Sequence, residues 1–414
     1  MGQPLMRVAY LVPRYGLEVI GGAEHATRRL AENLVDGGWS VEVFTTTALE
    51  STTWAHSYPE GTTAVNGVTV HRFRSGERAP DFDTMSQRVL AAPALVSAPD
   101  AELWIDLQGP ACPEALHAAA ACDADLVILY PYLYWPSVHG VRAFGTRTVL
   151  HPAAHDEPPI YLPLFRDVFA NTGGLVFQDL AERQVTERVL PQVAGVPQAL
   201  IGLGVDPQSG PPGASAELGV GENPFVLCLG RVDELKGTTF LAEWFAAYKA
   251  RRPGPTKLVF AGPVHNPPPA HPDIILAGPV TEPVKWAALR DAAALISPSA
   301  HEAFSLVLLE AWSVGTPVLV NGRGAVTAGH CRRSGGGLSF TSYGSFEVEL
   351  DRILSDENLR GRLGDAGQAY VNEFFTWGVL IPRYQAFLRA VAARHQEKMG
   401  QPKTEASDGY DRTA

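Results

Sequence analysis

The chain has 414 residues, of which 46% are hydrophobic and 19% charged, and its formal net charge is −11. This length exceeds what one hydrophobic core usually serves, so we expect two domains, and the apolar content argues against a disordered chain. The negative charge gives no electrostatic reason to expect nucleic acid or an anionic membrane as a partner. Any anionic ligand must therefore be held by a local group of donors.

Cysteine usage and the start of the chain bear on its location. Cys112, Cys122, Cys228 and Cys331 lie in different segments without a C-x-x-C pair, which favours reduced thiols in a cytosolic protein over a zinc site. The start "MGQPLMRVAYLVP" has too short an apolar stretch for a signal peptide, and no window approaches the roughly 18 apolar residues of a membrane span. We therefore expect a cytoplasmic protein, with no indication of membrane association.

The first half of the chain alternates strand-like and helical segments. Ala26, Leu30 and Leu34 repeat at helical spacing and Gly37 follows, which predicts an amphipathic helix with a glycine stop. Strand, turn, helix and strand at this spacing predict a right-handed crossover unit. Short runs rich in Val, Leu and Ile predict buried parallel strands at 7–12, 40–46, 68–73, 125–130, 147–151 and 174–178.

The pattern restarts after a stretch rich in Gly, Pro and Ser from Leu203 to Pro224. We therefore predict an α/β fold with two Rossmann-like domains that face each other across a cleft, the first over residues 1–205 and the second over 206–375. A helix near 376–395 could pack back on the first domain, and we expect 396–414 to be a disordered tail. The strands of the second half are predicted at 225–230, 257–262, 274–278, 294–299 and 316–320.

Two cations follow the first strand of the second half, in "FVLCLGRVDELKG". Ligands of parallel sheets bind beyond the carboxyl ends of strands, so this loop is a candidate site. Arg231 follows the strand directly, and Lys236 lies just before the next helix. Two cations beside a helix start predict an anion site of diphosphate size. The alternative is a surface pair that neutralises Asp233 and Glu234.

A second loop places two acids at the ends of an apolar run, in "HEAFSLVLLEAW". Glu302 falls in the loop after a strand, and Glu310 falls on a helix expected to start near Ser305, so both can reach one cleft. Ionised carboxylates accept hydrogen bonds from sugar hydroxyls. We expect Phe304, Ser305 and Leu306 to supply the free amides of the first helical turn, where a phosphate or hydroxyl would sit. The alternative is one acid in an N-terminal turn and one on a helix surface.

Several sequence motifs resemble those of glycosyltransferase family 4 and follow one another along the chain in the family's order. Members of this family are retaining enzymes with the GT-B fold. "ISPSAHEAFSLVLLEAWSVGTPVLV" is similar to the family's acid, seven residues, acid motif, and "LGRVDELKG" to its Arg…Lys motif. "VPRYGLEVIGGAE" resembles its N-terminal glycine loop and "HPAAHDEP" its cleft-facing histidine region. The resemblance covers essentially the whole chain. It departs from the family pattern at Ala303 and Ser305, where glycine is common and an added β-carbon narrows the sugar pocket or alters the loop.

The resemblance implies roles for the matching polar residues. Arg231 and Lys236 would bind the diphosphate of a nucleotide-sugar donor and stabilise it as it leaves. Glu310 would accept hydrogen bonds from the ribose hydroxyls, and Glu302 would contact the donor sugar.

The resemblance also implies a contribution from the first domain. Gly21 and Gly22 would let the backbone approach the phosphate closely. Of the two histidines in "VLHPAAHDEPP", the match to the family's His-Asp pair favours His155 as the one near the reacting carbon. His151 abuts a strand and is expected to be structural.

Neither a metal nor a cofactor is implied. The D-x-D pairs that begin at Asp81 and Asp123 lie in a polar connection and before a strand, so neither should meet the donor phosphates. Cationic side chains and helix ends can replace Mg²⁺ there.

The sequence thus predicts a retaining, metal-independent glycosyltransferase. It would move a sugar from a nucleotide diphosphate sugar to an acceptor carbohydrate or another hydroxyl compound. Two alternatives stay open: a nucleotide-sugar epimerase, which needs no acceptor, and a catalytically silent relative that only binds nucleotide sugar.

Overall fold

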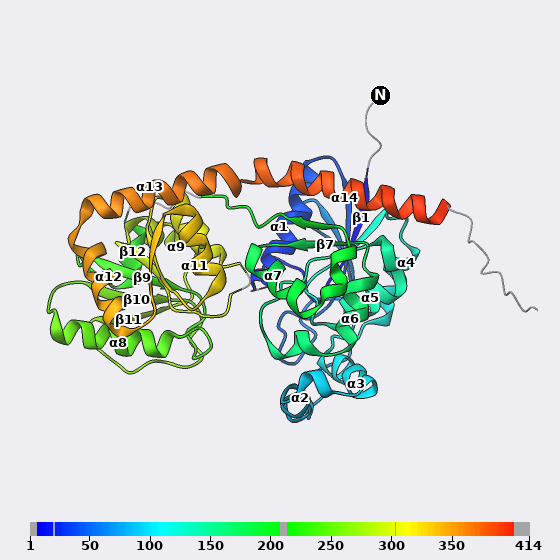
Figure 1. Cartoon of the computed structure of the whole chain (residues 1–414), viewed down its shortest axis with the longest axis horizontal. Helices are drawn as coiled ribbons and strands as arrows, with labels where there is room; N and C mark the ends of the chain where they lie inside the picture. Colours follow the sequence, from blue (N-terminus) through cyan, green and yellow to red (C-terminus); the bar gives the residue numbers. More distant parts are fainter. Residues whose placement is uncertain (1–5, 20, 208–212, 303, 401–414) are drawn as a thin grey trace, which may run out of the picture.

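The structure is a computed structural model that describes residues 6–19, 21–207, 213–302 and 304–400, and it has two α/β lobes side by side (Figure 1). The N-terminal lobe contains a sheet with the order β3-β4-β2-β1-β5-β6-β7-β8. All neighbours in it are parallel except β3 and β4. Its strands are β1 Arg7–Leu11, β2 Ser40–Thr46, β3 Gly61–Val65, β4 Val68–Phe73, β5 Leu126–Leu129, β6 Thr148–Leu150, β7 Gly174–Phe177 and β8 Gln198–Leu200.

The C-terminal lobe contains a parallel sheet with the order β11-β10-β9-β12-β13-β14. In a Rossmann fold the first strand lies between the second and the fourth. Likewise β9 lies between β10 and β12, and β1 lies between β2 and β5, which is the fourth strand when the antiparallel β3 is left out. The predicted α/β fold with two Rossmann-like domains is therefore confirmed. The strands are β9 Phe225–Leu229, β10 Lys257–Ala261, β11 Ile274–Gly278, β12 Ala294–Ser297, β13 Val318–Asn321 and β14 Gly337–Phe340.

Helices cover both faces of the two sheets, while α2 and α3 project from the N-terminal lobe (Figure 1). The predicted amphipathic helix is α1, which buries Ala26, Leu30 and Leu34 and ends before Gly37. The other helices are α2 Phe82–Leu90, α3 Ala98–Gln108, α4 Pro113–Ala121, α5 Trp135–Phe144, α6 Leu164–Asn171, α7 Leu180–Val189, α8 Thr238–Arg251, α9 Glu282–Asp291, α10 Leu306–Ser313, α11 Ala325–Ser334, α12 Tyr343–Ser355, α13 Glu357–Phe374 and α14 Trp377–Gly400, and α1 itself is Gly22–Asp36. Short 3₁₀ turns lie at Pro93–Leu95, Gly145–Arg147, Pro158–Tyr161, Pro191–Gly195 and Ala214–Leu218.

The C-terminal helix α14 lies across the N-terminal lobe (Figure 1). The hydroxyl of Tyr384 is 2.8 Å from Nε2 of His151, and Nδ1 of His395 is 2.8 Å from the hydroxyl of Thr146. Because α14 continues to Gly400, the prediction of a tail from residue 396 is wrong for 396–400. Residues 401–414 lie outside the described residues.

Two stretches of the chain run side by side where the lobes join. The Val205 amide donates to the Phe375 carbonyl at 2.9 Å, and Gly204 lies so close to Trp377 that an added β-carbon would be 2.4 Å from the indole. One apolar cluster includes buried residues of both lobes, from Val8 to Ala392. No helix in the described part of the chain is long and apolar enough to cross a membrane.

Candidate functional site

A cavity of about 310 Å³ lies between the lobes. It opens at the carboxyl ends of β9 and β12, the neighbouring strands at which the order of the C-terminal sheet reverses, where Rossmann-like sheets bind their ligands. Of the predicted site residues, Gly21 and His155 are not in its lining. Those that line it are Gly22, Arg231, Lys236, Glu302, Phe304, Ser305, Leu306 and Glu310.

The loop after β9 is a tight turn built around Asp233. Its buried carboxylate accepts a hydrogen bond from the Lys236 amide at 2.8 Å and lies 3.5 Å from Nε of Arg231. Gly237 ends the turn at φ +75°, and a β-carbon there would lie 3.1 Å from the Pro298 carbonyl. The turn thereby directs both cations to the cavity at the start of α8. Asp233 therefore does pair with Arg231, but it is a buried residue that holds the turn together and not a member of a surface ion pair.

The two acids of the second loop enter the cavity from different elements. Glu302, before α10, accepts a hydrogen bond from Nζ of Lys236 at 2.7 Å, and Glu310, on α10, accepts one from Nζ of Lys285 at 2.9 Å. Their side chains are only 18% and 9% exposed. The alternative of an acid on a helix surface is therefore wrong for Glu310. Each acid faces a lysine, so each is fixed in position before any ligand enters.

The start of α10 differs from the prediction by one residue. The helix begins at Leu306, with Ser305 as the residue that precedes it. The free amides of the first turn therefore include those of Leu306 and Val307, whereas Phe304 lies before the N-cap. Leu306 and Val307 both line the cavity. Ala303, the other departure from the family pattern, lies outside the described residues.

Ser305 has a backbone conformation that favours glycine. Its φ is +65°, in the left-handed region that costs an L-residue roughly 1–2 kcal/mol. Its buried hydroxyl has no hydrogen-bond partner among the described residues. Serine thus occupies a position whose backbone conformation glycine would adopt at a lower cost in free energy.

We expect Ser305→Gly to raise the free energy of unfolding by about 1 kcal/mol, because it relieves the left-handed strain. Urea denaturation of the wild type and the variant measures this difference. Ser305→Ala is the matched control, since it removes the hydroxyl but keeps the β-carbon and the strain. A Gly variant no more stable than the Ala variant would contradict this explanation.

The two candidate histidines lie in different surroundings. His151 is buried between Tyr130 and Tyr384, beneath α14, and burial lowers its pKa to about 3, so it is a neutral core residue. His155 is partly exposed, and its ring centroid lies 6.4 Å from that of His301. Burial lowers the pKa of His155, His301 lowers it further, and Glu302 opposes them. His155 is thus the histidine beside the cavity, although it is not in the lining.

Residues of the N-terminal lobe that the sequence did not single out close the cavity from the other side. Tyr130, Ala153 and Gln178 follow β5, β6 and β7 and line it. The fully buried carboxylate of Glu182 accepts hydrogen bonds from the amides of Ala154 at 3.0 Å and Gln178 at 2.7 Å. Glu182 thus ties the end of β6 to the end of β7. Only the rule that ligands lie beyond strand ends could have indicated these positions.

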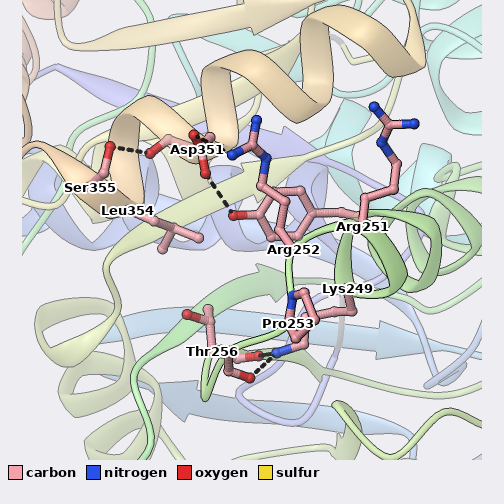
Figure 2. Close-up of a pocket in the computed structure, with 10 residues that line it drawn as sticks. Lys249, Arg251, Arg252, Pro253, Thr256, Asp351, Leu354 and Ser355 are labelled. Atoms are coloured by element: carbon pink, nitrogen blue, oxygen red, sulfur yellow. Dashed lines mark hydrogen bonds and ion pairs between the residues drawn. The ribbon is translucent and has the colours of Figure 1, made fainter.

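A second hollow, of about 430 Å³, lies on the outer side of the C-terminal lobe between α8 and α12 (Figure 2). Its basic side chains are already paired within the protein. Lys249 reaches the Thr256 carbonyl at 3.0 Å, and Arg252 lies 3.4 Å from Asp351. Arg251 turns away from Asp351 in Figure 2 and bonds Glu347. These contacts hold α8 to its neighbours and leave the interlobe cavity as the candidate site.

The acidic pairs considered for a cation are engaged elsewhere. Asp81 precedes α2 in the projecting part of the N-terminal lobe, and Asp123 pairs with Arg7 at 2.5 Å. Within the described residues, no three His, Cys, Asp or Glu side chains are grouped so that they could hold a metal ion.

Comparison with known proteins gives the class of this site. Residues 223–345 match the family model described as Glycosyl transferases group 1. This segment contains the Arg231…Lys236 turn, the Glu302…Glu310 loop and helix, and all six strands of the C-terminal sheet. The chain carries a group 1 glycosyl transferase domain. The protein is therefore a glycosyltransferase. Its narrower assignment to family 4 stays a prediction.

Similar proteins extend over nearly the whole chain. A D-inositol 3-phosphate glycosyltransferase from Stackebrandtia nassauensis is 26% identical, over 86% of this chain and 84% of the relative. The solved sucrose-phosphate synthase from Thermosynechococcus elongatus has a TM-score of 0.72 at 19% identity, covering 94% of this chain and 100% of that one. An α,α-trehalose-phosphate synthase (UDP-forming) from Burkholderia vietnamiensis has a TM-score of 0.67 at 15% identity, covering 93% and 100%. These likenesses show that the glycosyltransferase has the GT-B fold.

Proposed function

We propose that this glycosyltransferase moves a sugar from a nucleoside diphosphate sugar to an acceptor hydroxyl, with retention at the anomeric carbon and without a metal ion. The observation that carries the proposal is the cavity itself, in which Arg231, Lys236 and the amides of Leu306 and Val307 lie at two helix starts. Cations and helix N-termini bind diphosphate and stabilise the negative charge that develops when it leaves. The remaining proposed donor contacts come from both lobes.

Glu310 is the proposed acceptor for the ribose hydroxyls, and Glu302 the proposed contact for the donor sugar. Their lysine partners, Lys285 and Lys236, hold the carboxylates in place, and ionised carboxylates can accept hydrogen bonds from hydroxyls on their remaining lone pairs. Gly22 at the start of α1 is the proposed point at which the backbone of the N-terminal lobe approaches the donor, since it lines the cavity. Gly21 is the residue directly before α1.

The proposed chemistry needs no protein nucleophile. The bond between the anomeric carbon and the departing phosphate oxygen breaks, the acceptor oxygen bonds to that carbon on the same face, and the acceptor proton passes to the phosphate oxygen. His155 would lie beside the reacting carbon. Two adjacent stretches of the chain, near Val205 and near Phe375, join the lobes. Closure of the lobes about these stretches would align the reactants and exclude water.

The first experiment is a thermal-stability screen with nucleotide sugars, since a ligand at 100 times its Kd adds about 2.7 kcal/mol to the free energy of unfolding. The names of the relatives direct the search to UDP sugars, and to phosphorylated sugars and polyols as acceptors. Release of nucleoside diphosphate is then followed with and without acceptor. Acceptor-dependent release with a retained anomeric configuration supports the proposal. Conversion of the donor without acceptor indicates an epimerase, and binding without any turnover indicates a silent relative.

A further inference from the structure

The acid that pairs with His155 is not the one that follows it in sequence. Oε2 of Glu157 lies 3.2 Å from Nε2 of His155. Asp156 points to other partners, since its two carboxylate oxygens accept hydrogen bonds from Tyr161 and Arg188, both at 2.7 Å. The family resemblance had suggested a His-Asp pair at these positions. The structure provides a His-Glu pair instead.

Glu157 is itself held from the core of the N-terminal lobe. The hydroxyl of Tyr132 donates to its other oxygen, Oε1, at 3.0 Å. Tyr132 is fully buried and packs edge-on against Phe165 and Phe169, so its hydroxyl has a fixed position. The Glu157 side chain is 17% exposed, whereas that of Asp156 is 52% exposed. The chain Tyr132, Glu157, His155 therefore runs from a rigid core to the edge of the cavity.

We propose that Glu157 is the positioning residue for His155: its carboxylate lies 3.2 Å from Nε2 and favours a proton on that nitrogen, which fixes the tautomer and the orientation of the imidazole beside the donor cavity. The partner of one ring nitrogen decides which nitrogen carries the proton in a neutral histidine. The other ring nitrogen, Nδ1, is buried and has no hydrogen-bond partner among the described residues, so Glu157 is the acid that distinguishes the two nitrogens. The expected effect of Glu157 on catalysis rests on the proposed function, whereas its effect on the tautomer of His155 does not.

The electrostatic surroundings make this contact sensitive to pH. Burial raises the pKa of Glu157 to about 7, and the Tyr132 hydroxyl opposes that rise. Other groups face the pair as well: Tyr134 near Glu157, and His301, Glu302 and Lys236 near His155. As the pH falls through 7, Glu157 gains a proton and the contact with His155 weakens. Activity should therefore decline on the acid side of neutrality.

Kinetics of three variants test the catalytic effect. We expect Glu157→Gln to lower kcat at least about tenfold, as loss of an orienting carboxylate does elsewhere, and to leave the donor KM unchanged, because the donor contacts come mainly from the C-terminal lobe. Asp156→Asn, the matched control in the same loop, should keep both values. Tyr132→Phe should move the acid limb of the pH profile to higher pH, since it removes the hydroxyl that lowers the pKa of Glu157. An acid limb that stays in place in Tyr132→Phe, or an equal loss of kcat in Asp156→Asn, would overturn the proposal.

A spectroscopic test does not depend on turnover. Nitrogen NMR of the full chain reports the tautomer of His155, whose signals are identified by their absence in His155→Gln. We expect the Nε2–H tautomer in the wild type and a shift towards Nδ1–H in Glu157→Leu, in which no carboxylate faces Nε2. The same tautomer in both proteins would refute the role of Glu157. If no nucleotide sugar is turned over by the wild type, the proposed function fails, while this measurement still decides the assignment of Glu157.

Discussion

Lys236→Ala is expected to lower kcat/KM by about two to three orders of magnitude with a nucleotide-sugar donor, the usual effect of losing one well-placed group that stabilises developing charge. Lys236 is the ammonium that the turn around Asp233 brings to the cavity wall. Its loss also leaves the carboxylate of Glu302 without its partner at 2.7 Å. The diphosphate of the donor would then face an unpaired carboxylate instead of an ammonium. Donor binding would weaken, and the departure of the nucleoside diphosphate would slow. Steady-state kinetics with saturating acceptor measure the change.

The control for this variant is another lysine of the same lobe. Lys257 bonds Asp273 at 2.6 Å, and the two side chains are 22% and 21% exposed, close to the values for Lys236 and Glu302. Lys257 is not in the lining of the cavity, so Lys257→Ala should retain the activity of the wild type. If Lys236→Ala turned over donor as fast as Lys257→Ala, the assignment of Lys236 to the phosphate would be wrong.

The sequence predicts the sheet well wherever a strand is both apolar and central. Runs such as those at β5 and β9 are buried along nearly their whole length, and burial on both faces leaves a continuous apolar signal. The strands that escaped prediction lie at or near sheet edges. β3 consists of exposed residues such as Thr62 and Thr63, and β14 is a short run with one fully buried side chain, so neither carries a pattern that differs from a loop.

The candidate site is predictable as far as it depends on position along the chain. Each of the four charged residues lies in the loop that follows a strand or on the next helix, and a parallel sheet necessarily brings such loops to one edge. They are Arg231, Lys236, Glu302 and Glu310. Contacts that depend on where a side chain turns are not predictable in this way. Asp156 and Glu157 are both acids after the same histidine, and their partners distinguish them: Tyr161 and Arg188 hold Asp156, whereas the Tyr132 hydroxyl holds Glu157 beside the ring.

The second large effect is expected for Trp312, which anchors the helix that carries Glu310. Its indole is fully buried, and its Nε1 donates to the Gly336 carbonyl at 2.8 Å. The ring lies so close to α13 that a β-carbon on Gly367 would be 2.1 Å from it. Replacing a buried tryptophan by alanine usually costs about 3–5 kcal/mol. We expect Trp312→Ala to lose this much in the unfolding transition of the C-terminal lobe, because backbone contacts on both sides prevent the site from collapsing.

Trp312→Phe separates the packing from the hydrogen bond. Phenylalanine retains most of the ring but leaves the Gly336 carbonyl without its donor, so we expect a loss of about 1–3 kcal/mol. Urea denaturation followed by circular dichroism measures both variants, and nucleotide-sugar titration of the folded proteins reports on the site. Because Glu310 lies two residues before Trp312 on α10, donor affinity should fall in Trp312→Ala and hold in Trp312→Phe. Equal losses of stability in the two variants would show that the hydrogen bond to Gly336, rather than the packing of the indole against α13, holds α10 in place.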